Sequence, residues 1–269
     1  MANMEQHLEV HRLSLHFGGV QALNRVDLQV RKGTVFSLIG PNGAGKTSLI
    51  NCVSKFYAPQ EGRILFKDRE ITRMRPYQVA RCGISRTFQN IELFKAMTVL
   101  DNIKLGRHIH LRTGPISALV YLGKAKREEK ELEEFLDREI LGFLGLTSIK
   151  NRVVGTLPYG LQKRVDLARA LSPKPEFLIL DEPVAGMNRE ERQDMIKHIL
   201  DIKEAWGLTV LLIEHDMEVV MNISDWIAVM NFGEKIAEGP PEAVKKNPEV
   251  IRIYLGHAYE GTEGGEARS

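Results

Sequence analysis

The sequence is poor in cysteine, in long apolar runs and in net charge. Its 269 residues include two cysteines, Cys52 and Cys82, which are far apart and in no metal-ligand spacing, so a disulfide scaffold is excluded. The longest apolar runs are five residues, Ala118–Leu122 and Trp226–Met230. A membrane-spanning helix needs roughly twenty residues, so we expect no segment to span a bilayer. The net charge of +2 gives no reason to expect nucleic acid as the main ligand.

The overall composition is that of a globular protein. The hydrophobic fraction is 43% and the charged fraction 27%, which excludes intrinsic disorder as a description of the whole chain. The length allows either one domain or one domain with a subdomain. The first ten residues carry no apolar core of the kind a signal peptide needs, and the cysteine usage suits a reducing cytoplasm.

The N-terminal part alternates apolar and polar residues with the period of an antiparallel sheet. The run Val35–Ile39 differs, because it is nearly all apolar, as in a central strand covered on both faces. A short strand at Gly62–Phe66 is followed by a turn at Lys67-Asp68. The alternating apolar positions are Leu8, Val10, Leu13, Leu15, Val26, Leu28 and Val30.

The middle of the chain is predicted to be helical from about Thr98 to Ile149. The charges within Lys124–Leu146 are expected to form a solvated face. The apolar positions of this segment recur at helical spacing, at Leu132, Phe135, Leu136, Ile140 and Phe143.

Strand-like runs return at Phe177–Leu180 and Thr209–Ile213, separated by an amphipathic helix. Strand, helix and strand in this order indicate a βαβ unit. The fold class is therefore α/β, with a helical insertion of about 60 residues in a core of parallel strands. The apolar positions of the intervening helix are Met195, Ile196, Ile199 and Leu200.

A phosphate-binding loop follows the buried strand Val35–Ile39. Its pattern is G-x-x-x-x-G-K-[ST], between a strand and a predicted helix, which argues against a chance glycine-rich turn. Glycines let successive N–H groups converge on phosphate oxygens, and the helix adds its positive dipole end. Lys46 is expected against the β- and γ-phosphates, the Thr47 hydroxyl on Mg²⁺, and Ser48 near the α-phosphate. The ATP-binding loop is Gly40, Pro41, Asn42, Gly43, Ala44, Gly45, Lys46 and Thr47.

Two carboxylates end the strand at Phe177–Leu180. A buried strand that ends in Asp presents its carboxylate at the carboxyl edge of a parallel sheet. We expect Asp181 to hold Mg²⁺ through its water shell and Glu182 to polarise the attacking water. The alternative, a strand ending at a capped turn, is disfavoured by the phosphate loop.

Together these motifs resemble the ATP-binding subunits of ABC transporters over nearly the whole chain. The resemblance implies a P-loop NTPase fold with a RecA-like core, an N-terminal antiparallel β subdomain and a helical subdomain. It implies a single domain over 1–269, in which 1–90 and 161–256 form the β subdomain and core. The helical subdomain is 91–160, and 257–269 form a disordered tail.

The resemblance assigns three further residues. Gln89 matches the Q-loop glutamine, which contacts Mg²⁺ and the attacking water; the alternative is an ordinary loop amide. His215 ends the strand Thr209–Ile213 with Glu214 and matches the switch histidine that touches the γ-phosphate. Phe17, 29 residues before Lys46, matches the aromatic that stacks on adenine, although an aromatic at a strand end is more often part of a core. A metal site at His108 and His110 is disfavoured, because residues two apart do not share a helix face.

The signature motif departs from the family pattern. Most members read Leu-Ser-Gly-Gly-Gln, where the serine donates to a γ-phosphate; Pro158 replaces it and has neither a hydroxyl nor an N–H. We expect this half-site to close over ATP and to stabilise the transition state less. The loop after the strand Phe177–Leu180 and its two carboxylates also departs, with Asn188 where many members carry Asp. The signature residues, which act in trans, are Pro158, Tyr159, Gly160, Leu161 and Gln162.

The resemblance also implies partners. One subunit's signature faces the other's nucleotide, so the chain needs a second ABC ATPase, as a homodimer or a heterodimer. Two membrane permease subunits and, indirectly, a periplasmic substrate-binding protein complete the system. The expected location is peripheral, on the cytoplasmic face of the inner membrane, with no nucleic acid partner.

Within the family, the chain is most similar to the ATPases of branched-chain amino-acid importers. This rests on segments such as His16–Ala22, Arg86–Gln89, Pro158–Gly160 and Ile213–Met217. An insertion at Arg112–Arg127 also fits; its apolar patch Ile116–Leu122 would suit a partner or pack inside the helical subdomain. Importers of urea, amides or aromatic acids, a lipopolysaccharide-type exporter, and an ABC ATPase acting on ribosomes or DNA remain alternatives.

Overall fold

The computed structural model describes residues 5–107 and 124–260. The chain divides into two units: Met1–Val79 with Thr209–Ser269 forms unit 1, and Ala80–Leu208 forms unit 2. Within the described residues, none of the helices has the length and apolar character needed to cross a bilayer. The patch Ile116–Leu122 and the pair His108 and His110 lie outside the described residues.

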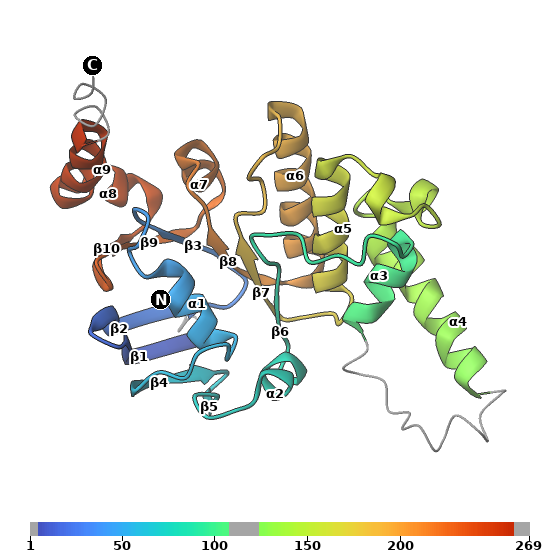
Figure 1. The fold of residues 1–269 in the computed structure, drawn as a ribbon, viewed down its shortest axis with the longest axis horizontal. Helices are drawn as coiled ribbons and strands as arrows, with labels where there is room; N and C mark the ends of the chain where they lie inside the picture. Colours follow the sequence, from blue (N-terminus) through green and yellow to red (C-terminus); the bar gives the residue numbers. More distant parts are fainter. Residues whose placement is uncertain (1–4, 108–123, 261–269) are drawn as a thin grey trace. The chain divides into compact units, whose positions relative to one another are not determined.

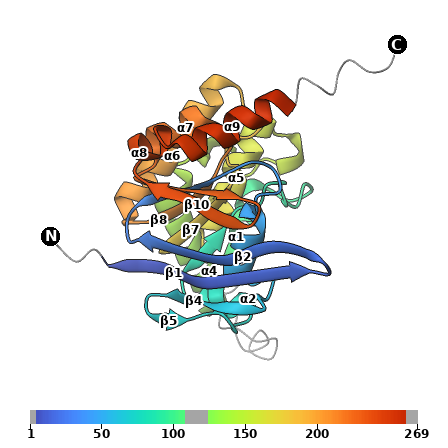
Figure 2. The same ribbon diagram turned by 90° about the vertical axis from the view of Figure 1, so that its left-hand side faces the viewer.

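Unit 1 contains the expected antiparallel sheet, which Figure 2 shows with its two long strands side by side. Its order is β2-β1-β4-β5, formed by Val20–Arg31, Gln6–Phe17, Glu61–Phe66 and Arg69–Glu70. The expected alternating positions are all buried, because they share one face of the sheet. The turn between β4 and β5 places Lys67 and Asp68 at positive φ, as a tight hairpin requires.

The second group of strands in unit 1 surrounds β3 (Val35–Ile39). It runs parallel to β8 (Thr209–Ile213) on one side and to β9 (Trp226–Asn231) on the other, and β10 (Glu234–Gly239) pairs antiparallel with β9. Every residue of β3 and β8 is buried. The prediction of central strands covered on both faces is confirmed, and it explains why these runs are almost wholly apolar.

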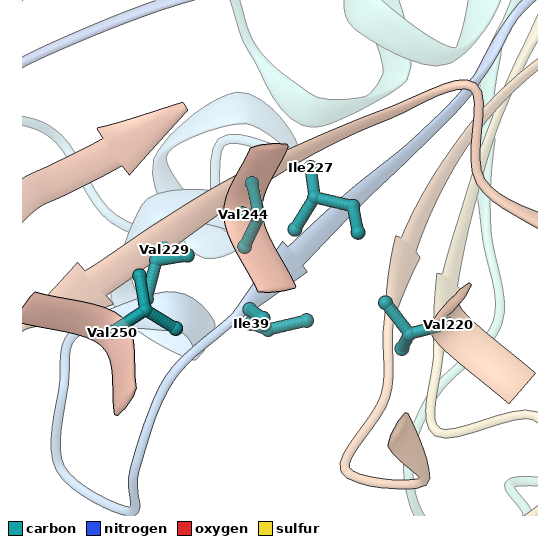
Figure 3. Close-up of a cluster of buried hydrophobic side chains, with 6 residues drawn as sticks. All are labelled: Ile39, Val220, Ile227, Val229, Val244 and Val250. Atoms are coloured by element: carbon teal, nitrogen blue, oxygen red, sulfur yellow. The ribbon is translucent and has the colours of Figure 1, made fainter. Parts of the chain in front are cut away.

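Helices α7 (Met217–Ile223), α8 (Pro241–Lys245) and α9 (Pro248–Glu260) supply a small apolar core against these strands. Each side chain of the cluster is at most 5% exposed, and full burial of such a side chain stabilises by about 1.5–3 kcal/mol. Helix α9 continues through Glu260 and so includes residues 257–260 of the expected tail 257–269; residues 261–269 lie outside the described residues. Figure 3 shows the cluster: Ile39, Val220, Ile227, Val229, Val244 and Val250.

Unit 2 joins a parallel strand pair to several helices (Figure 1). Strand β6 (Ile84–Arg86) pairs in parallel with β7 (Phe177–Asp181). Helix α2 (Pro76–Arg81) precedes β6 and begins in unit 1. The helices described in unit 2 include α3 (Val99–Gly106), α4 (Lys124–Leu136), α5 (Tyr159–Leu171) and α6 (Arg189–Trp206), with short turns at Thr147–Ile149 and Val154–Thr156.

The predicted helix Lys124–Leu146 is interrupted. Helix α4 ends at Leu136 and continues as the π-helical turn η3 (Asp137–Leu141), in which Gly142 N donates to Asp137 O at 3.2 Å. The i to i+5 bond adds a residue to the turn and rotates the following side chains. Phe143, placed on the apolar face by its spacing, is therefore 38% exposed, and Leu144 and Leu146 are buried instead.

Helix α6 begins with a capping box. The Asn188 side chain accepts from Glu191 N at 3.0 Å, and the Glu191 side chain accepts from Asn188 N at 3.1 Å. Met195 and Ile199 are buried as predicted, whereas Ile196 and Leu200 are half-buried. Asn188, where the family often has Asp, thus has a structural use at the start of the helix.

Candidate functional site

The phosphate loop of unit 1 depends on two tightly packed glycines. Gly40 has φ 146° and Gly45 has φ 98°. A Cβ at Gly40 would lie 2.1 Å from the Met230 carbonyl oxygen, and one at Gly45 would lie 2.6 Å from the Ala22 carbonyl oxygen. No side chain fits at either position, so the loop backbone packs directly on neighbouring strands.

The loop folds around the Lys46 ammonium. Its Nζ donates to the carbonyl oxygens of Gly40 at 2.7 Å and Pro41 at 2.9 Å, and the residue is 6% exposed. Helix α1 (Lys46–Val53) begins here without a side-chain cap and without an acidic residue in its first turn. Its first N–H groups and dipole favour an anion, so the observed loop fits a phosphate group. Thr47 is exposed and Ser48 is half-buried in the same turn.

The C-terminal helix also reaches this loop. Burial raises the pKa of Tyr254 to about 12, although a backbone hydrogen bond from Gly40 acts in the opposite direction. Tyr254 packs against the cluster that includes Ile39, the residue before the loop. The sequence contained no motif for this contact, because it joins α9 to a loop more than 200 residues earlier.

Phe17 ends β1 and is 46% exposed, so it is not a core residue. Its ring meets the Tyr57 ring edge to face, with centroids 5.0 Å apart and an interplanar angle of 74°. Tyr57 is itself 38% exposed. An exposed aromatic face of this kind is able to stack on a planar ring.

His215 follows β8 and is exposed, while its neighbour Glu214 is 4% exposed. The Glu214 carboxylate accepts from His215 N at 3.0 Å, and Asp216 caps α7 by accepting from Glu218 N at 3.0 Å. Since a buried carboxylate and a helix cap hold the backbone on either side, the position of His215 is well defined at the strand end.

In unit 2, Asp181 ends β7 as predicted and is 4% exposed. Its Oδ2 forms a salt bridge with Arg86 Nη2 at 2.8 Å, and both side chains are at most 8% exposed. The Thr87 hydroxyl accepts from Asp181 N at 3.3 Å. A buried carboxylate needs such a partner, and the Arg86 contact was not predicted from the sequence.

Glu182 and Gln89 are brought together. Gln89 Nε2 donates to Glu182 Oε2 at 3.0 Å, although the residues are 93 positions apart. Glu182 has φ 50°, a conformation that non-glycine residues rarely adopt. Lys163, which the sequence did not single out, donates from Nζ to the carbonyl oxygens of Gln89 at 3.0 Å and Glu182 at 3.2 Å.

The signature segment begins α5. Pro158 is the N-cap, and no side chain caps the helix. Tyr159 is exposed and packs toward Gly186, where an added Cβ would lie 3.1 Å from the Tyr159 ring. Gln162 Nε2 donates to the carbonyl of Leu157 at 2.8 Å. Leu161 is half-buried, whereas Gly160 is buried with the Glu191 side chain 2.5 Å from the place of a Cβ.

These features define an ATP-binding cassette, and comparison with known proteins agrees. The family model described as "ABC transporter" matches residues 23–185, and the model described as "Branched-chain amino acid ATP-binding cassette transporter" matches residues 234–260. The chain therefore belongs to the ABC transporter ATP-binding family and is an ABC-type ATPase.

Among its relatives is the high-affinity branched-chain amino acid transport ATP-binding protein BraF of Pseudomonas aeruginosa, 44% identical over 251 residues. The match covers 93% of this chain and 98% of that protein. The corresponding protein LivG of Escherichia coli is 43% identical over 253 residues, with the same coverage. The crystal structure of the ADP conformation of MJ1267, an ATP-binding cassette of an ABC transporter, has TM-score 0.81 and 38% identity, covering 93% of this chain and 99% of that one.

Proposed function

We propose that this chain is the ATP-hydrolysing subunit of an ABC importer for branched-chain or other hydrophobic amino acids. The 3.0 Å contact between Gln89 and Glu182 is the observation that supports ATP hydrolysis. The Glu182 carboxylate is able to accept a proton from water, and the Gln89 amide is able to orient that carboxylate. Relatives named as branched-chain amino acid transport proteins, matched over 98% of their length, support the substrate class.

In unit 1, the phosphate loop holds the nucleotide. The Lys46 ammonium exchanges its carbonyl partners for β- and γ-phosphate oxygens, and the first N–H groups of α1 donate to the same phosphates. Ser48 contacts the α-phosphate, Phe17 stacks on adenine, and His215 donates to the γ-phosphate. The loop as a whole comprises Gly40, Pro41, Asn42, Gly43, Ala44, Gly45, Lys46 and Thr47.

Thr47, Gln89 and Asp181 would supply oxygen ligands of the type Mg²⁺ prefers, directly or through water. The ion would neutralise the charge that develops on the phosphates. The Arg86 guanidinium pairs with the Asp181 carboxylate at 2.8 Å and orients it. Glu182 accepts the proton of the attacking water, and Gln89 holds that carboxylate in position.

A second ABC ATPase supplies the signature contacts to this nucleotide, and this chain's segment from Pro158 to Gln162 serves the partner's nucleotide. Two permease subunits and a substrate-binding protein complete the importer, with this chain on the cytoplasmic face of the membrane. ATP holds the two ATPases together, and hydrolysis releases them.

Co-purification in mild detergent tests the proposal. We expect the native complex to contain a second ABC ATPase and permease subunits, and reconstituted vesicles to accumulate labelled leucine only with ATP. The Glu182→Gln complex is the control, which should bind leucine without accumulating it. Uptake of urea or an aromatic acid in place of leucine, or association with ribosomes or DNA at physiological salt, would contradict the proposed substrate class or the transport role respectively.

A further inference from the structure

Helix α5 carries a stripe of three charged residues, two of which are buried. Lys163, Asp166 and Arg169 are three positions apart, so they lie near one another along the helix surface. Lys163 is 4% exposed and Asp166 is 2% exposed. Charged side chains are buried to this degree only when they have polar or charged partners. The partners of these residues lie in the chain segment that contains Gln89.

All three residues bind the backbone of the segment that contains Gln89. Lys163 Nζ donates to Gln89 O at 3.0 Å. The Asp166 carboxylate accepts from the backbone N–H of Phe88 and from Arg169 Nη2 at 2.7 Å. Arg169 Nη1 donates to the carbonyl of Glu92. The segment 88–92 is thus fixed to α5 at successive points along the helix.

Lys163 also joins this segment to the catalytic strand. The same Nζ donates to Glu182 O at 3.2 Å, so one ammonium bridges the two residues whose side chains form the 3.0 Å contact. Glu182 holds a left-handed conformation with φ 50°. Such a conformation persists only where its surroundings over-determine it, and the Lys163 bond is one such constraint.

From this geometry we propose, on the basis of the function above, that Lys163 is a positioning residue. It aligns Gln89 and Glu182, with Asp166 and Arg169 fixing the segment that carries Gln89. Helix α5 begins at the signature segment, about one turn before Lys163. A shift of this helix therefore moves the Lys163 ammonium, which binds the backbone of both Gln89 and Glu182. The signature of one subunit is thereby coupled to water activation in the same subunit.

The test compares Lys163→Met, Lys163→Gln and Lys163→Arg in the assembled complex, with exposed Lys197→Met as the matched control. We expect Lys163→Met and Lys163→Gln to lower kcat about tenfold or more with little change in KM for ATP, because binding uses other residues. Lys163→Arg, which retains donors for two carbonyls, should recover most of the turnover. Lys163→Gln keeps a donor and folds even where Lys163→Met does not.

In the background of Glu182→Gln, the Lys163 substitutions should lower kcat by less than in the wild-type background, because one of the two side chains that Lys163 aligns has already lost its function. A normal kcat in Lys163→Gln, or an equal fall in kcat and ATP affinity, would overturn the positioning role. A wild-type complex without ATPase activity, or full turnover in Glu182→Gln, would instead overturn the proposed function, so the two failures are distinguishable.

Discussion

Gln89 Nε2 and Glu182 Oε2 are 3.0 Å apart, and the backbone carbonyls of the same two residues share the Lys163 ammonium. The two side chains that we propose to act on water are thus connected twice within unit 2. Neither residue is deeply buried, so this geometry comes from hydrogen bonds and a left-handed backbone rather than from tight packing.

Replacing Glu182 by Gln removes the proposed proton acceptor and keeps the side-chain volume. We expect turnover to fall by a factor of about 10² or more while ATP still binds, since loss of a general base typically costs 10²–10⁴-fold. Single-turnover hydrolysis and filter binding of radiolabelled ATP measure the two properties, and dimers should accumulate with ATP. Glu190→Gln, on an exposed residue of α6, is the control and should retain full turnover.

Replacing Pro158 by Ser restores a hydroxyl at the N-cap of α5. Turnover of the assembled complex should rise, because one oriented donor is worth on the order of 3 kcal/mol in a transition state. The nucleotide-free protein should gain about 1 kcal/mol from the new cap. Steady-state ATPase rates and thermal melting separate the two effects. An unchanged ATPase rate would show that the missing serine does not limit this half-site.

Replacing Gly40 by Ala forces a Cβ to within 2.1 Å of the Met230 carbonyl oxygen at φ 146°. The loop must shift, so we expect ATP affinity to be lost together with about 1–3 kcal/mol of stability, the range of strained backbone sites. Gly19→Ala is the control, because its Cβ meets nothing within 4 Å and should leave both properties near wild type. Isothermal titration and urea unfolding provide the comparison.

His198 on α6 predicts a dependence of stability on pH. Burial, and secondarily the Arg164 charge, lowers its pKa from 6.5, while Asp194 acts in the opposite direction. The folded state thus takes up this proton less readily than the unfolded chain. The stabilisation is present above about pH 6.5 and is lost as the pH falls through the folded-state pKa.

Melting temperatures between about pH 7.5 and 5.5 measure this effect, because the decline spans the ordinary histidine pKa. In His198→Gln the decline should be shallower, whereas the exposed His16→Gln should follow the wild type. Equal slopes in all three proteins would assign the pH dependence to other groups.

Much of the fold could be predicted because its signals are local. The alternation in β1 and β2, the apolar runs of β3, β7 and β8, and the loop from Gly40 to Thr47 each follow from neighbouring residues. The end of α4 could not, since the π-helical bond from Gly142 to Asp137 changes the side-chain period within an otherwise regular pattern.

The sequence by itself determined the family, the phosphate loop, the carboxylates after β7 and the departure at Pro158, because each is a short pattern with a fixed chemical meaning. Tertiary structure alone decided that Arg86 pairs with Asp181 and that Lys163 bridges residues 74 and 19 positions away. Every residue has a backbone carbonyl, and the sequence contains many possible ion pairs. The sequence pattern therefore does not show which of these groups meet. Only the folded arrangement of β6, β7 and α5 selects which contacts form.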